Sequence, residues 1–148
     1  MLRHRGPDDQ GFLLVNQGQA IPYSGDDTAA KGLEQLPETL EAPNALLHRR
    51  LSILDLSPNG HQPMRHQDRE IYLNLNGEIY TFQELRDQHK LSDTTDTDTE
   101  VIRKLYAKIG EEAFVKFRGK GALAIVESEK NELAMYRDEL GITQLKHK

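Results

Sequence analysis

The fold of this chain is decided by one stretch of its sequence, Ile71-Tyr72-Leu73-Asn74-Leu75-Asn76-Gly77-Glu78-Ile79-Tyr80. Up to residue 76 its aliphatic side chains alternate with Tyr and Asn, the period-2 pattern of a β-strand with one buried face. A strand of this kind needs a packed layer against its apolar face. We therefore predict a strand over 71–76 that ends at Gly77, in a domain with two facing antiparallel sheets. A hairpin over residues 122–136 is expected to form another part of these sheets.

Capping signals predict two helices after this strand. Thr81-Phe82-Gln83-Glu84 and Thr97-Asp98-Thr99-Glu100 both have the form in which a threonine side chain bonds the N-terminus of a helix. The second helix has its apolar residues on one face and is expected to end at Gly110. A further short helix is expected over 111–117.

The first half of the chain predicts less regular structure. Residues 12–15, 45–48 and 51–54 are short apolar runs that we interpret as strands. Residues 17–43 are rich in Gly, Pro, Asp, Ser and Glu. That composition predicts a long loop, either an insertion or a functional flap, with a short helix over 28–36.

Composition excludes several classes of protein. The 148 residues fit one domain, 1–148, and carry 19 Lys and Arg against 24 Asp and Glu, a net charge of -5. This balance gives no electrostatic footprint for nucleic acid. The absence of cysteine excludes disulfides and thiolate metal sites. The sequence shows no secretory signal and no apolar run that could span a bilayer, so we expect a cytoplasmic protein without a membrane partner.

Other catalytic signatures are missing from the sequence. The histidines show no metal-ligand spacing, and the acidic run 93–100 lacks the glycine and the ligand spacing of a calcium loop. There is no Gly-x-Ser-x-Gly elbow and no phosphate-binding glycine loop. We therefore predict no metal and no cofactor in this chain.

Three polar features are candidates for ligand binding. The Gly77 N–H and the Asn76 amide could donate to an oxyanion, although Asn and Gly are also ordinary turn residues. Arg50 could bind a carboxylate with two parallel hydrogen bonds, or could lie with Arg49 as a solvated pair. Asp98 could accept from an ammonium group, or could cap the following helix. Taken singly, these residues leave each alternative open.

Taken together and in order, several segments resemble the glutaminase (class II glutamine amidotransferase) domain of the asparagine synthase family, which hydrolyses glutamine. The resemblance implies an α+β fold, a four-layer α/β/β/α sandwich of the N-terminal-nucleophile hydrolase type, here lacking its first strand. It extends from His4 to about Leu145 and rests on residues 4–8 (His-Arg-Gly-Pro-Asp), 50–57, 60–64 (Gly-His-Gln-Pro-Met), 76–80 (Asn-Gly-Glu-Ile-Tyr), 98–100 and 137–142.

The same resemblance implies a glutamine site. Arg50 would hold the α-carboxylate, and Asn76 and Gly77 would form the oxyanion hole. Glu78 and Asp98 would hold the α-ammonium group. The pocket would be lined by the segment that follows Arg50, namely Leu51, Ser52, Ile53 and Leu54.

The chain also departs from the family. The family nucleophile is an N-terminal cysteine, and ammonia passes to a synthase domain that uses ATP and Mg²⁺. These 148 residues contain no cysteine. Lys120-Gly121 stands where the family usually has Met-Phe, which predicts a buried charge or a void.

Three functions follow from these departures. The chain could be a truncated asparagine synthase glutaminase domain that is inactive alone. It could be a subunit completed by a separately encoded fragment that brings the nucleophile, with a synthase-domain protein as partner. It could also be a non-catalytic module for glutamine binding or protein interaction.

Overall fold

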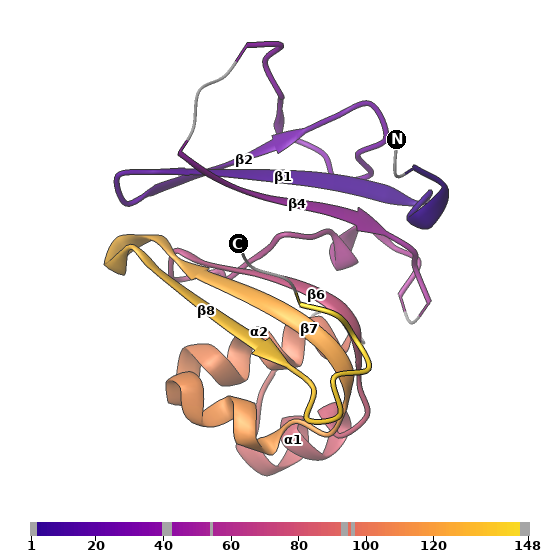
Figure 1. Ribbon diagram of the computed structural model, residues 1–148, viewed down its shortest axis with the longest axis vertical. Helices are drawn as coiled ribbons and strands as arrows, with labels where there is room; N and C mark the ends of the chain where they lie inside the picture. Colours follow the sequence, from indigo (N-terminus) through magenta and orange to yellow (C-terminus); the bar gives the residue numbers. More distant parts are fainter. Residues whose placement is uncertain (1–2, 40–42, 54, 93–94, 96, 146–148) are drawn as a thin grey trace.

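The computed structural model describes residues 3–39, 43–53, 55–92, 95 and 97–145 and shows two four-stranded sheets stacked face to face (Figure 1). The first sheet has the strand order β3-β2-β1-β4 and the second the order β5-β6-β7-β8. Neighbouring strands are antiparallel except β2 and β3. This confirms the predicted pair of facing sheets. The strands are β1 Asp9–Asn16, β2 Gln19–Ser24, β3 Glu34–Gln35, β4 Asn44–Arg50, β5 Met64–Arg65, β6 Ile71–Ile79, β7 Gly119–Glu127 and β8 Glu132–Arg137.

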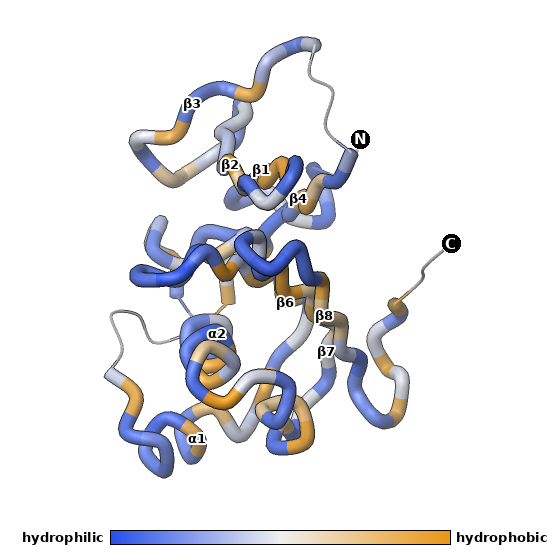
Figure 2. The backbone as a smooth tube through the Cα atoms, turned by 90° about the vertical axis from the view of Figure 1, so that its left-hand side faces the viewer, coloured by the Kyte–Doolittle hydropathy of each residue, from blue (hydrophilic) through white to orange (hydrophobic). Residues whose placement is uncertain are grey.

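The helices lie on the outer face of the second sheet, away from the first sheet (Figures 1 and 2). They are α1 Phe82–His89 and α2 Asp98–Ile109, with short 3-10 segments at Arg3–Arg5, Pro58–Gly60, Gly110–Lys116 and Ser128–Lys130. Alternate residues of β6 and β7 point toward these helices and form the larger apolar core with them, including Ile71, Leu73, Leu123 and Ile125. In the described part of the chain no α-helix covers the outer face of the first sheet.

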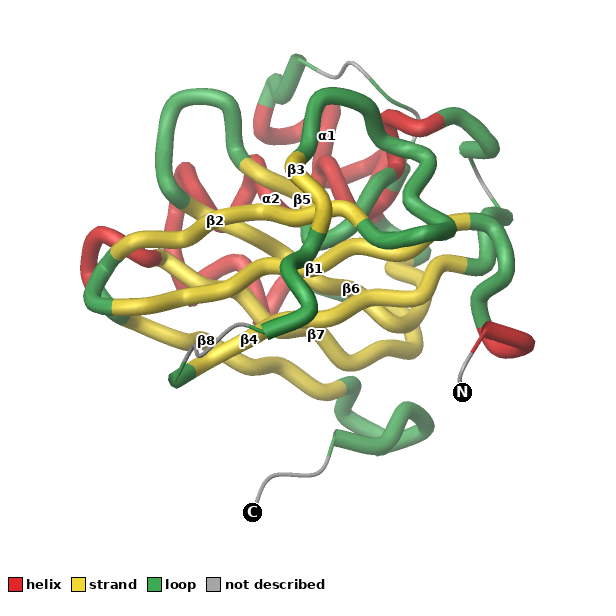
Figure 3. The backbone as a smooth tube through the Cα atoms, turned by 90° about the horizontal axis from the view of Figure 1, so that it is seen from above, coloured by secondary structure: helices red, strands yellow, loops and turns green. Residues whose placement is uncertain are grey.

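The layer between the two sheets differs from one end to the other. Seen from above, the first sheet covers the second (Figure 3). At one end Leu13 and Val15 pack against Tyr72 and Val126 in a small apolar cluster. Toward the other end the inward-facing positions of the same strands become polar, beginning with Asp9 on β1. The polar end of this layer holds the candidate site.

The interpretation of residues 17–43 as a loop with a short helix is wrong in part. β2 forms a hairpin with β1, and β3 adds two residues beside it. The connecting turn is Gln17-Gly18, with φ values of 48° and 82°, so both residues adopt the positive φ that favours a tight hairpin turn. No helix occurs over 28–36.

The boundaries of two strands also differ from prediction. β4 runs through both arginines and ends at Arg50, so the expected break at the arginines is absent and residues 51–53 are irregular. β6 does not end at Gly77 but continues to Ile79, because Gly77 stays in register with Gly121 of β7.

Of the two predicted threonine caps, one is confirmed, although the Glu100 carboxylate accepts from the Thr95 N–H rather than from that of Thr97. The Thr97 hydroxyl accepts a hydrogen bond from the Glu100 N–H at 3.2 Å, and α2 ends at Gly110 as expected. The Thr81 side chain makes no capping bond to α1 and instead accepts one from the Arg118 N–H at 3.2 Å. The segment after Gly110 is a 3-10 helix.

Candidate functional site

A pocket of about 400 Å³ lies between the sheets at the polar end. The first sheet contributes the end of β4, and the second contributes the end of β6 and the start of β7. The N-terminus of α2 and the segment after β4 complete the wall. The lining residues are Arg5, His48, Arg49, Arg50, Leu51, Ile53, Asp55, Gly60, Gln62, Leu75, Asn76, Gly77, Glu78, Thr97, Asp98, Thr99 and Lys120.

Gly77 allows β6 and β7 to approach closely beside the pocket. Its φ is +154°, and a Cβ placed on it would lie 2.2 Å from the Lys120 carbonyl oxygen and 2.3 Å from the Gly121 Cα. Only glycine fits both constraints. The close approach leaves the backbone of Gly77 exposed at the pocket, next to the exposed Asn76.

Arg50 is buried and supports the loop that follows it. Its guanidinium donates to the carbonyl oxygen of Ser57 at 2.9 Å and to that of Asp55. A Cβ on Gly60 would collide with this guanidinium, so Gly60 also shapes the space that Arg50 fills. A guanidinium has five N–H donors, so these two bonds leave donors for a ligand carboxylate.

Asp98 is a buried carboxylate on the opposite wall. One of its oxygens accepts from the Ile79 N–H at 2.9 Å, and the other accepts from the Thr99 N–H at 2.8 Å. Burial raises its pKa above the ordinary value of 3.8, and these backbone bonds only partly offset that effect. Because Thr97 caps α2, Asp98 is not needed as the cap. A cation in the pocket would relieve the desolvation of its carboxylate.

Gln62 connects the two walls of the pocket. Its side-chain oxygen accepts from the Leu75 N–H at 2.7 Å, and its amide nitrogen donates to the Thr99 hydroxyl at 3.5 Å. Gln62 therefore fixes β6 just before Asn76 and α2 just after Asp98. Nothing in its own side chain signalled this role, although it lies in the Gly-His-Gln-Pro-Met segment singled out above.

A buried acid–histidine cluster lies behind the pocket. Asp9 on β1 is hydrogen-bonded at 2.7 Å to the Nδ1 of His61. Burial alone would raise the Asp9 pKa, but the bonds from His61 and from the Ala29 and Gln10 N–H groups lower it overall. Burial lowers the pKa of the neighbouring His48 to about 4. His48 is therefore neutral at pH 7, with one ring nitrogen able to donate a hydrogen bond and the other able to accept one.

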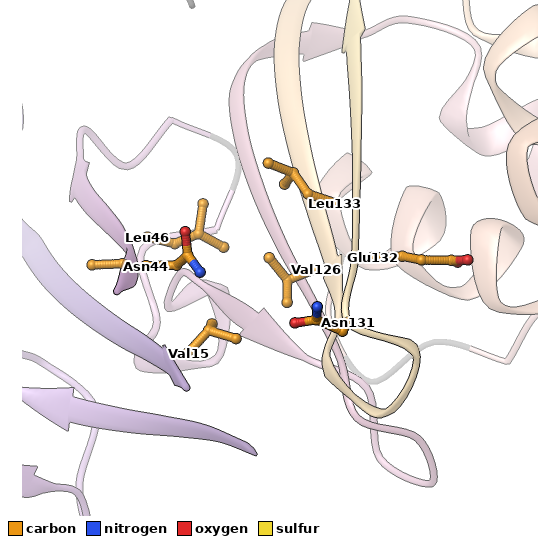
Figure 4. Close-up of a pocket in the computed structure, with 8 residues that line it drawn as sticks. Val15, Asn44, Leu46, Val126, Asn131, Glu132 and Leu133 are labelled. Atoms are coloured by element: carbon orange, nitrogen blue, oxygen red, sulfur yellow. The ribbon is translucent and has the colours of Figure 1, made fainter. Parts of the chain in front are cut away.

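A second cavity, at the other end of the inter-sheet layer, has a different character. It has a volume of about 310 Å³, and Val15, Leu46, Val126 and Leu133 face one another across it (Figure 4). Its charged residue, Glu132, points away from this group in Figure 4. The residues that line this cavity include no cationic side chain that could bind the carboxylate of an amino acid.

Comparison with known proteins shows the family of this chain. Residues 19–148 match the family described as the glutamine amidotransferase domain. The chain belongs to this glutamine amidotransferase family. It is 35% identical over 156 residues to putative asparagine synthetase [glutamine-hydrolyzing] 2 of Methanocaldococcus jannaschii, covering 95% of this chain and 26% of that protein. It is also 35% identical over 148 residues to asparagine synthetase B of Escherichia coli, covering 98% and 22%. The chain thus spans about a quarter of the length of these relatives.

A solved structure supports the fold of this amidotransferase domain. Glutamine phosphoribosylpyrophosphate amidotransferase from B. subtilis, complexed with ADP and GMP, superposes with a TM-score of 0.75 at 21% identity. The match covers 95% of this chain and 33% of that one. The fold is an α+β sandwich of the N-terminal-nucleophile hydrolase type, as expected. Of the four expected layers the described residues contain three, since no α-helix covers the first sheet.

The polar pocket brings together most of the predicted site residues. Seven of them line it, namely Arg50, Leu51, Ile53, Asn76, Gly77, Glu78 and Asp98. Ser52 does not line the pocket, and its N–H donates to the Asp8 carboxylate at 2.7 Å. Leu54 lies outside the described residues. Sequence reasoning missed His48, Gln62 and Thr99.

The described residues contain no group of three or more His, Cys, Asp or Glu side chains placed to hold a metal ion. They also contain no helix that is long and apolar enough to cross a membrane.

Proposed function

We propose that the polar pocket of this amidotransferase-family domain binds glutamine. The α-carboxylate would be held by Arg50 and the α-ammonium group by Asp98 and Glu78. The side-chain amide would then reach Asn76 and Gly77. The observation that carries this proposal is the meeting of a buried guanidinium from the first sheet with a buried carboxylate from α2 in one pocket of suitable size.

The charges of the pocket support this orientation. A free amino acid presents opposite charges on one carbon, and charge-assisted bonds to both are stronger than neutral ones. Asp98 keeps its carboxylate in a site where burial disfavours the ionised form. An ammonium group beside Asp98 would favour the ionised carboxylate, so the ligand cation and the protein anion would stabilise each other.

We also propose that these 148 residues bind glutamine without hydrolysing it. An oxyanion hole stabilises a tetrahedral intermediate only after a nucleophile has attacked, and this chain contains no thiol. A polypeptide that brings a cysteine to the pocket would complete the glutaminase half of an asparagine synthetase-type reaction. A synthase-domain protein would then use the ammonia.

Calorimetric titration with glutamine tests the binding proposal. We expect the wild type to bind and Arg50→Lys to bind at least about tenfold more weakly, because lysine keeps the charge but loses the two-pronged geometry. Arg65→Ala is a matched control, since Arg65 is an exposed arginine on β5 that pairs with Glu70. Circular dichroism checks that Arg50→Lys still folds. Equal heats for wild type and Arg50→Lys would remove Arg50 from the site.

A glutaminase assay tests the absence of turnover. We expect no glutamate or ammonia above background from the purified chain. A thiol-directed inhibitor serves as control, because the chain has no thiol to modify. Turnover that resists the inhibitor would overturn the proposal, whereas turnover that the inhibitor abolishes would come from a contaminating enzyme.

A further inference from the structure

Lys120 places a positive charge at the mouth of the pocket. It is the second residue of β7 and pairs in register with Glu78 of β6. Leu123 and Ile125 of β7 belong to the core under the helices, so the even-numbered positions of this strand face the first sheet. Lys120 therefore lies on the pocket face, and it is exposed there. The predicted buried charge is wrong, because this lysine is not buried.

Gly121, the next residue, has close neighbours at the point where a side chain would begin. Gly121 is buried, and a Cβ placed on it would lie 3.3 Å from the Gly77 Cα and 3.4 Å from the Asn76 carbonyl oxygen. Glycine at position 121 thus leaves room for β6 and β7 to lie close together at Gly77. The same approach brings the backbone of Lys120 against Gly77.

The ammonium group of Lys120 is available to a ligand. Among the described residues no hydrogen bond or ion pair involves this side chain. Glu78 lies directly opposite Lys120 on the neighbouring strand, and both residues line the pocket. Arg50 is on the other sheet, so the two cations lie on opposite walls.

We propose that Lys120 makes this pocket select amino acids whose side chain ends in a carboxylate, glutamate above all, over glutamine. The inference rests on the proposed orientation, in which the end of the ligand side chain lies at Asn76 and Gly77. Glutamate and glutamine have the same length and differ only at this end. The backbone and amide donors there serve a carboxylate oxygen as well as an amide oxygen, whereas the lysine ammonium favours the charged group.

Titrations of glutamine and glutamate into wild type and Lys120→Met test this selection. We expect the wild type to bind glutamate about two- to fivefold more tightly than glutamine, the range for a solvent-exposed ion pair. In Lys120→Met this ratio should fall to one or below. Raising the salt concentration should reduce the wild-type ratio, because exposed charges are screened. Lys31→Met is the matched control, since Lys31 is exposed and does not line the pocket.

The outcomes separate the two proposals. Binding of glutamine with the same glutamate-to-glutamine ratio in wild type and Lys120→Met overturns the role of Lys120 and leaves the glutamine site standing. Tighter binding of glutamine than of glutamate by the wild type would also overturn the role of Lys120 and leave the glutamine site standing. A wild type that binds neither amino acid overturns the glutamine site itself, and the selection with it.

Discussion

The side-chain oxygen of Gln62 accepts a hydrogen bond from the backbone N–H of Leu75 at 2.7 Å. β5 pairs with β6 only as far as Leu73, so the Gln62 side chain continues the hydrogen bonding of this edge beyond the end of β5. The bond is buried, and it lies immediately before the two residues assigned to the oxyanion hole.

Loss of this bond should destabilise the fold. Gln62→Leu keeps the approximate size of the side chain but leaves the Leu75 N–H buried without a partner, which costs about 1–3 kcal/mol. Urea denaturation measures the change. Gln67→Leu, at an exposed loop position, should lie within about 0.5 kcal/mol of wild type. Equal midpoints for the two variants would show that the bond does not contribute.

Gly77→Ala should be more harmful than alanine at another glycine of positive φ. Gly32 has a φ of +81° and open space around it, so Gly32→Ala reports the backbone cost alone, about 1–2 kcal/mol. Gly77→Ala adds a collision with the backbone of β7 and should cost about 2–5 kcal/mol. Thermal or urea unfolding of both variants gives the difference. Similar losses would mean that β7 moves aside without penalty.

Binding of glutamine should weaken in acid because of Asp98. The pKa of its carboxyl is raised above 3.8 by burial, so protonation begins at a higher pH than for an ordinary aspartate. Since the proposed contact to the α-ammonium group needs the ionised form, affinity should fall as the pH drops through this raised pKa. Calorimetry over a pH series measures the effect.

Asp98→Asn should bind glutamine at least about tenfold more weakly at neutral pH, because one member of a buried charge pair is lost. The same variant should lose the acid dependence of the residual affinity. Asp68→Asn, at an exposed position, is the control. An unchanged pH profile in Asp98→Asn would assign the acid dependence to another group.

His48 should make the fold sensitive to mild acid. Its pKa is about 4 in the folded chain against an ordinary value of 6.5, so the unfolded chain takes up a proton first as the pH falls. The stability present above pH 6.5 is therefore lost between pH 6.5 and about 4. A difference of about 2.5 pH units corresponds to about 3 kcal/mol. Denaturation of His48→Gln should show a flatter dependence in this window, whereas His4→Gln, at an exposed site, should follow wild type.

The sequence predicted the second sheet better than the first. Strand β6 and the β7–β8 hairpin were found because alternation along a strand with one buried face is a local pattern. β2 was missed because its run Gln19–Ser24 is short, contains a proline and is only partly buried. Its presence depends on pairing with β1, which local composition does not reveal.

The candidate site was predictable where the family pattern named residues, and less so elsewhere. Arg50, Asn76 and Asp98 were expected and do line one pocket. Gln62 acts through the N–H of Leu75, thirteen residues away, and His48 through its burial. Both roles arise only when the two sheets meet, so no spacing along the chain could indicate them.

The division of the inter-sheet layer into an apolar end and a polar pocket has a consequence for how the domain opens. At one end the two sheets are held together by the small apolar cluster of Leu13, Val15, Tyr72 and Val126. At the other end Arg50 lies on the first sheet, and Asp98 lies on α2, which packs on the second sheet. A bound amino acid would therefore bridge the two sheets, and its binding free energy would add to the free energy needed to separate them. In such a domain, ligand binding and the packing of the two sheets are thermodynamically linked, so a change in one changes the other.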